Sequence, residues 1–80
     1  MGNAMPPIRG FRFFFYSNEG REPPHIHVAK GGGAAKWWLS PLQEEYSYGF
    51  TVQERRMIKE LIKSNLDKLI DKWYEEANKK

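Results

Sequence analysis

The segment after Thr51 carries an apolar stripe at helical spacing, and this stripe constrains the fold more than any other feature. Its members recur every three or four residues, as on one face of an α-helix. They are Ile58, Leu61, Ile62, Leu66, Leu69, Ile70, Trp73, Tyr74 and Ala77. Thr51 and Glu54 have the spacing of a capping box, in which each side chain accepts a hydrogen bond from the other residue's backbone amide. We therefore predict a helix over 52–77.

The alternative is a break near 64–65. Ser64 and Asp67 repeat the capping-box spacing, and Asn65 occupies a position of the apolar stripe. A broken helix could fold its second half back onto the rest of the chain, whereas an unbroken one would extend past it. The sequence leaves both arrangements open.

The length of the predicted helix bears on whether the chain needs a partner. An unbroken helix over 52–77 would be about 39 Å long at about 1.5 Å per residue. A strand of ordinary length spans only about 17–20 Å. The distal stripe of such a helix would have to be buried against a second copy or a different protein. The expected contact residues are Leu66, Leu69, Ile70, Trp73 and Tyr74.

The residues before Thr51 are typical of an antiparallel meander. Strong β-formers occupy 8–16, 25–30 and 34–39, and 43–47 is a fourth candidate strand. Three consecutive glycines, 31–33, favour a hairpin turn between two of these strands. Together with the helix, the pattern predicts an α+β fold in which a three- to four-stranded sheet is packed by a C-terminal helix.

The chain length allows one domain. Residues 1–4 are typical of a cloning remnant and are expected to lie outside the fold, so the domain is predicted over 5–80. A polar loop is expected over 17–24, where turn-forming residues cluster.

Composition excludes several classes of protein. The chain has no cysteine, so disulfides and thiolate metal sites are excluded, and no apolar run approaches the length of a membrane helix. There is no leader pattern, and we expect a soluble cytoplasmic protein without a cofactor. The formal net charge of +3 permits contact with nucleic acid without requiring it.

The two histidines of the chain, His25 and His27, stand one residue apart in a predicted strand. They would share one face with their Cα atoms about 6.6 Å apart. Such a pair could bind a metal ion with help from Glu22, Glu44 or Glu45, or act as acid and base on a phosphodiester. A half-exposed pair that bonds locally or contacts a partner is the structural alternative. His-x-His alone is a weak metal signal, and no metal site is predicted.

Aromatic and basic residues are interleaved along the predicted strands. Such surfaces can stack nucleic-acid bases, although most aromatic side chains in a small domain belong to its core. Trp37 and Trp38 cannot share a face, so one of them is expected on the less buried side. The candidate binding residues are Arg12, Tyr16, Lys30, Lys36 and Trp38.

Several of these motifs together resemble a known family. They are the segment Gly10-Phe11-Arg12-Phe13-Phe14-Phe15-Tyr16, the segment Glu22-Pro23-Pro24-His25-Ile26-His27-Val28, and Gly49-Phe50-Thr51 before a helix that ends in a tryptophan. This pattern is similar to a family of small bacterial proteins known only as a domain of unknown function. The resemblance implies a gene neighbour encoding a second small protein, the two forming a predicted toxin–antitoxin pair.

Two hypotheses follow from these observations. In the first, the chain is a binding module that holds a small cognate protein or a second copy of itself. In the second, it is a small ribonuclease-like toxin that uses His25 and His27 as its acid–base pair.

Overall fold

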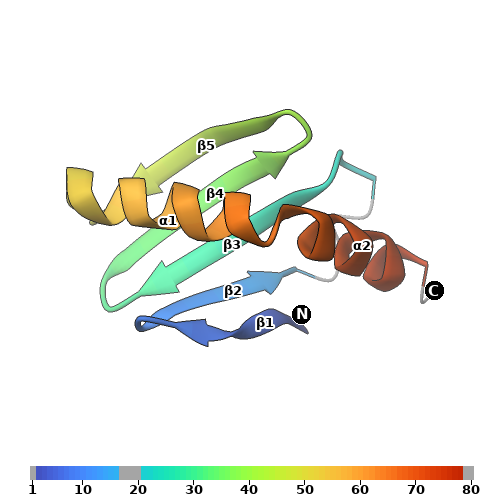
Figure 1. Ribbon diagram of the computed structural model, residues 1–80, viewed down its shortest axis with the longest axis horizontal. Helices are drawn as coiled ribbons and strands as arrows, with labels where there is room; N and C mark the ends of the chain where they lie inside the picture. The colour runs from blue at the N-terminus through green and yellow to red at the C-terminus, as the bar shows by residue number, and fades with distance from the viewer. Residues whose placement is uncertain (1, 17–20, 79–80) are drawn as a thin grey trace.

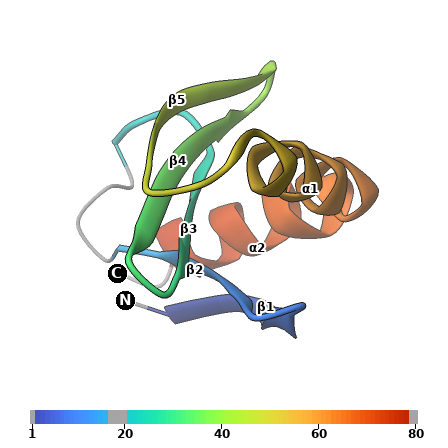
Figure 2. The same ribbon diagram turned by 90° about the vertical axis from the view of Figure 1, so that its left-hand side faces the viewer.

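The computed structural model describes residues 2–16 and 21–78, and within them five strands form one antiparallel sheet with two helices on a single face (Figures 1 and 2). The strands are β1 (Gly2–Ile8), β2 (Phe11–Phe15), β3 (His25–Lys30), β4 (Gly33–Leu39) and β5 (Leu42–Tyr48), and they lie in this order across the sheet. The helices are α1 (Val52–Ser64) and α2 (Leu66–Ala77). The predicted α+β meander is confirmed. Of the predicted loop over 17–24, residues 17–20 lie outside the described part.

The first strand was not expected from the sequence. Gly2–Ile8 pairs with β2, so residues 2–4, which the sequence suggested are a cloning remnant, take part in the sheet, and Met1 lies outside the described residues. The segment predicted as one strand over 8–16 is divided at Arg9 and Gly10, which both have positive φ. Two prolines are tolerated in β1 because it is an edge strand, where a missing N–H breaks few ladder bonds.

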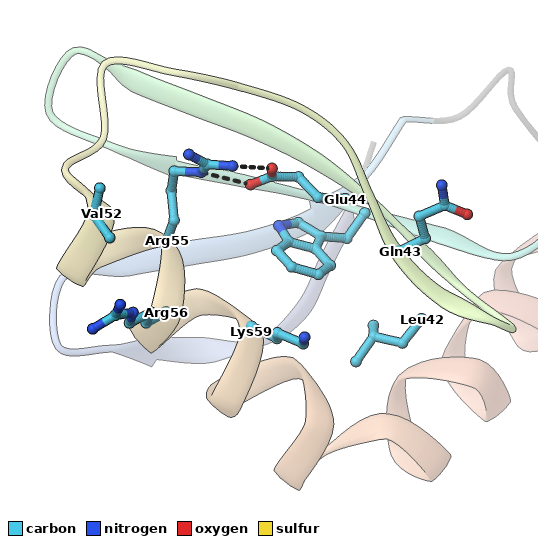
Figure 3. Close-up of a pocket in the computed structure, with 8 residues that line it drawn as sticks. Leu42, Gln43, Glu44, Val52, Arg55, Arg56 and Lys59 are labelled. Atoms are coloured by element: carbon cyan, nitrogen blue, oxygen red, sulfur yellow. Dashed lines mark hydrogen bonds and ion pairs between the residues drawn. The ribbon is translucent and has the colours of Figure 1, made fainter.

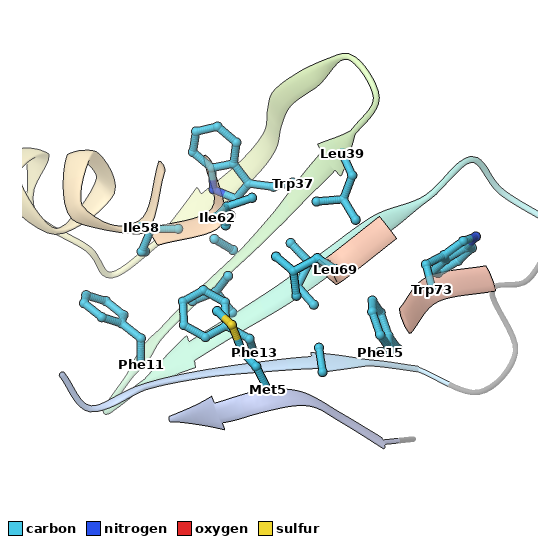
Figure 4. Close-up of a cluster of buried hydrophobic side chains, with 14 residues drawn as sticks. Met5, Phe11, Phe13, Phe15, Trp37, Leu39, Ile58, Ile62, Leu69 and Trp73 are labelled. Carbon is cyan, nitrogen blue, oxygen red and sulfur yellow. The ribbon is translucent and has the colours of Figure 1, made fainter. Parts of the chain in front are cut away.

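Alternate residues of the central strands supply the core. Phe11, Phe13 and Phe15 of β2 all point toward the helices and are buried. Figure 4 shows the cluster between sheet and helices, in which these rings meet side chains from α1 and α2. The predicted division between Trp37 and Trp38 is also confirmed, because Trp37 is buried under the helices and Trp38 is half-buried on the opposite face.

The helical stripe is divided at Asn65, as the broken-helix alternative anticipated. The Thr51–Glu54 capping box opens α1 as predicted, with Glu54 N donating to Thr51 Oγ1 at 3.0 Å. The second predicted capping box is wrong. Asn65 rather than Ser64 precedes α2, no side chain caps that helix, and Asn65 Nδ2 donates back to the Leu61 carbonyl at 2.8 Å.

Because the helix is broken at Asn65, its second half does not extend past the sheet. The length of the helix therefore no longer requires a partner. Figure 1 shows α2 leaving the axis of α1 and crossing the sheet, where it contacts β1, β3 and β4. Ile58 and Ile62 of α1 and Leu69 and Trp73 of α2 are all buried in one core, so both halves of the stripe cover the chain's own sheet. Of the described helices, none is long and apolar enough to cross a membrane.

The hairpin between β3 and β4 leads to a first prediction. A Cβ added at Gly33 would lie 2.3 Å from Phe50 Cε1, whereas one added at Gly32 would meet nothing within 4 Å. We expect Gly33→Ala to lower the free energy of unfolding by about 1–3 kcal/mol, because the Phe50 ring must move. Gly32→Ala is the matched control and should be near neutral. Urea denaturation of both variants measures this, and equal stabilities would contradict the packing of Phe50 on β4.

The position of α2 leads to a second prediction. Leu69 is fully buried, whereas Tyr74 on the same helix is 53% exposed. We expect Leu69→Ala to cost about 2–5 kcal/mol of stability. Tyr74→Ala should cost less than about 0.5 kcal/mol. Urea midpoints that are independent of protein concentration would show that the stripe is buried within one chain, and equal midpoints for the two variants would contradict it.

Candidate functional site

The face of the sheet opposite the helices carries most of the residues that the sequence singled out, and we call it the open face. Strand pairing places opposed residues on the same side, so His25 lies beside Trp38, and His27 lies beside Phe14 on one side and Lys36 on the other. The open face consists of Arg12, Phe14, Tyr16, His25, His27, Lys36, Trp38, Tyr46 and Tyr48.

His27 is enclosed by aromatic rings. Its imidazole stacks on Phe14, with ring centroids 5.8 Å apart and planes at 22°, and meets the edge of Tyr16 at 4.4 Å. Only 5% of its surface is exposed. The side chain is therefore a packing element between β2 and β4, more deeply buried than a half-exposed strand histidine.

His25 is fully buried at the start of β3. Its Nδ1 lies 3.0 Å from the carbonyl oxygen of Pro23, and because a carbonyl only accepts, this contact places the proton on Nδ1. Pairing of β2 with β3 ends at Phe14 and His27, and beyond it the indole of Trp73 reaches the imidazole of His25 at a centroid distance of 4.6 Å. His25 thus joins the open face to α2.

The two imidazoles lie 5.2 Å apart, so the predicted side-by-side placement is correct. Their burial does not favour an acid–base role, because a substrate phosphate would have to displace covering side chains to reach either ring. Among the described residues, no group of three His, Asp or Glu side chains could hold a metal ion.

Of the three acidic side chains that were candidates to assist the histidines, Glu22 lies near one of them, and Glu44 and Glu45 pair with other residues. Glu22 accepts from Lys36 Nζ at 2.8 Å and lies 3.9 Å from His25 Nδ1. Glu45 accepts from Trp38 Nε1 at 2.8 Å, and Glu44 pairs with Arg55 on the helix side of the sheet.

The basic candidates are divided between the two faces. Lys36 lies on the open face, where its ammonium group is 4.5 Å from the centre of the Trp38 ring and is paired with Glu22. Arg12 is exposed on the same face. Lys30 lies on the helix side, with Nζ 4.6 Å from the centre of the Phe11 ring, so the structure does not bring it together with the others.

Tyr46 and Tyr48 are the open-face residues that sequence reasoning missed. They extend the aromatic surface onto β5, with ring centroids 5.4 Å apart and exposures of 36% and 68%. Their alternate spacing was a usable signal, but 43–47 was ambiguous as a strand. The pairing of β4 with β5 also changes register between Lys36 and Trp37, and counting alternate residues along the sequence does not reveal such a change.

The residues expected at a partner interface on the helix have mixed positions. Leu69 and Trp73 belong to the core, and Leu66 and Ile70 are partly buried against it. Tyr74 alone among the five is exposed. The distal helix therefore offers little apolar surface.

Comparison with known proteins identifies a family for most of the chain. Residues 10–74 match the family model described as "Domain of unknown function (DUF4160)". No curated protein and no solved structure matches.

Burial of the histidines leads to a third prediction. Diethyl pyrocarbonate acylates accessible imidazole nitrogens, so the folded protein should react far more slowly than the protein in urea. The absorbance of the modified histidines follows both reactions. Rapid modification of both rings in the folded protein, at the rate of a free histidine peptide, would contradict the burial of His25 and His27.

Proposed function

The chain belongs to the DUF4160 family, whose function is unknown, and we propose that it is a protein-binding module that uses the open face of its sheet. The observation that carries this proposal is the set of exposed tyrosines on that face. Tyr16, Tyr46 and Tyr48 are 46%, 36% and 68% exposed, and they lie on the open face, which neither helix covers. Figure 2 shows this side of the sheet free of helices.

Exposed aromatic side chains suit protein contact. Tyrosine and tryptophan bury a large area at low entropic cost and are enriched among residues that dominate binding energy. Tyr16 is supported by Phe14 and His27, and Trp38 by His25 and by its hydrogen bond to Glu45. These contacts hold the rings in place before a partner arrives, which lowers the cost of ordering them.

The charges on this side favour a protein over a nucleic acid. Arg12 and Lys36 supply two positive charges, and two negative ones come from Glu22 beside Lys36 and Glu45 beside Trp38. Nucleic-acid affinity depends mainly on cations that neutralise phosphates. Lys36 is already paired with a carboxylate, so a phosphate would have to compete with Glu22 for it.

Family resemblance suggests the kind of partner. Similar bacterial proteins are encoded beside a second small protein, and the two are predicted to form a toxin–antitoxin pair. We therefore propose that the chain is one component of such a pair and that the open face contacts the second component. A second copy of this chain is the competing occupant.

Binding is tested by co-expression with the product of the neighbouring gene, followed by size-exclusion chromatography. The wild-type chain should elute in a complex, and Tyr48→Ser should weaken it by about tenfold or more, as loss of a well-placed interface tyrosine does. Tyr74→Ser is the matched control, because Tyr74 is also about half exposed but lies on α2. It should leave the complex intact.

If nucleic acid or a second copy of the chain binds the open face, binding experiments give different results. A labelled oligouridylate that binds the chain more tightly than the neighbouring gene product would favour the nucleic-acid alternative. A dimer of the chain alone, lost in Tyr48→Ser, would identify a second copy as the partner. Equal loss of the complex in both tyrosine variants, or no complex at all, would contradict the proposal.

A further inference from the structure

A cleft of about 460 Å³ lies on the helix side, between the first half of α1 and the strands β4 and β5 (Figure 3). It is separate from the open face and has no part in the proposed function. Three of its lining residues are basic and one is acidic, and the rest include two apolar side chains and the indole of Trp37. The lining residues are Trp37, Leu42, Gln43, Glu44, Val52, Arg55, Arg56 and Lys59.

One of the three cations already has a partner. Arg55 donates two hydrogen bonds to the carboxylate of Glu44, at 3.0 Å from Nε and 2.5 Å from Nη2, as the dashed lines in Figure 3 mark. This hydrogen-bonded carboxylate raises the pKa of Arg55. The pair forms one wall of the cleft and fixes the position of the guanidinium group.

The other two cations have no such partner. Within the described part of the chain, neither Arg56 nor Lys59 forms an ion pair. Figure 3 shows Lys59 extending from α1 toward Leu42, along the floor of the cleft. Three cations and one carboxylate line the cleft, and only the carboxylate and Arg55 are paired with each other.

The indole nitrogen of Trp37 gives a second and independent observation. Trp37 is only 5% exposed, and its Nε1 is a buried donor without a hydrogen-bond partner among the described residues. A buried donor without a partner destabilises the folded state, so native structures usually satisfy it with protein, water or ligand. An indole N–H can only donate, which means that the missing group is an acceptor.

An acceptor and a negative charge are both supplied by an oxyanion. We propose that this cleft binds a small molecule with a carboxylate or phosphate group, whose oxygen accepts from Trp37 Nε1 and pairs with Lys59. Leu42 and Val52 offer apolar surface to a short hydrocarbon part of the ligand. Because Nε1 is buried, a side chain of the cleft lining must move as the ligand enters.

The three tryptophans of the chain make the test direct, since each contributes one indole N–H signal to a nitrogen–proton correlation spectrum. Sodium phosphate and sodium succinate are titrated separately into the labelled full chain, against sodium chloride at matched ionic strength. The signal that Trp37→Phe removes should shift saturably with at least one oxyanion and not with chloride. The Trp38 signal, whose N–H is bonded to Glu45, should stay in place.

Variants separate a built site from general charge attraction. Lys59→Gln should weaken the oxyanion by about tenfold, as expected for loss of one charge-assisted hydrogen bond. Lys68→Gln removes an exposed lysine on α2, away from the cleft, and should have no effect. The remaining backbone signals report that each variant is folded.

The two anions also indicate the ligand class. A response to phosphate alone identifies a phosphate-bearing ligand, and a response to both identifies a general oxyanion site. The proposal is overturned if neither anion shifts the Trp37 signal saturably, if chloride gives the same shift, or if Lys59→Gln and Lys68→Gln behave alike. None of these results bears on the open face.

Discussion

Packing of α2 against the chain's own sheet is the contact on which the rest of the structure depends. Leu69 and Trp73 enter the same core as the phenylalanines of β2. Both helices lie on one side of the sheet, and neither covers the other side. The division of roles between the faces therefore follows from the turn at Asn65, which redirects the second half of the helical stripe onto the strands.

The two histidines have a packing role in this arrangement. Their spacing in sequence is typical of metal or acid–base chemistry, but the structure makes them supports for an aromatic surface. His27 holds Tyr16 and Phe14, and His25 connects Trp38 to Trp73. Rings that are packed against one another in this way lose little side-chain freedom on binding, which supports the proposed role in recognition.

Much of the fold could be predicted from local patterns. Side chains of a strand point alternately to its two faces, which predicts the buried phenylalanines of β2 and the separation of Trp37 from Trp38. The capping box predicts the start of α1. The strand β1 could not be predicted, because prolines and a glycine hide its pattern and only its pairing with β2 reveals it. The break at Asn65 was one of two alternatives. Ile62 and Leu69 would lie on the same face of a continuous helix, so the apolar spacing does not reveal the break.

The sites were harder to predict than the fold. Which face the helices cover decides whether an aromatic residue is core or surface, and this depends on tertiary packing. The cleft at Arg55 depends on a shifted register between β4 and β5, which brings Glu44 to the helix side. The charged side chains of α1 have the mixed signs that are typical of a solvent-exposed helix face. In the structure, some of them line this cleft.

The helical stripe is buried on the chain's own sheet, and we propose that a partner binds the open face. The indole N–H signals of Trp38 and Trp73 report these two sides separately, since Trp38 lies on the open face and Trp73 in the core under α2. On addition of the neighbouring gene product, we expect the Trp38 signal to shift or broaden while the Trp73 signal changes much less. A change at Trp73 with none at Trp38 would contradict this proposal.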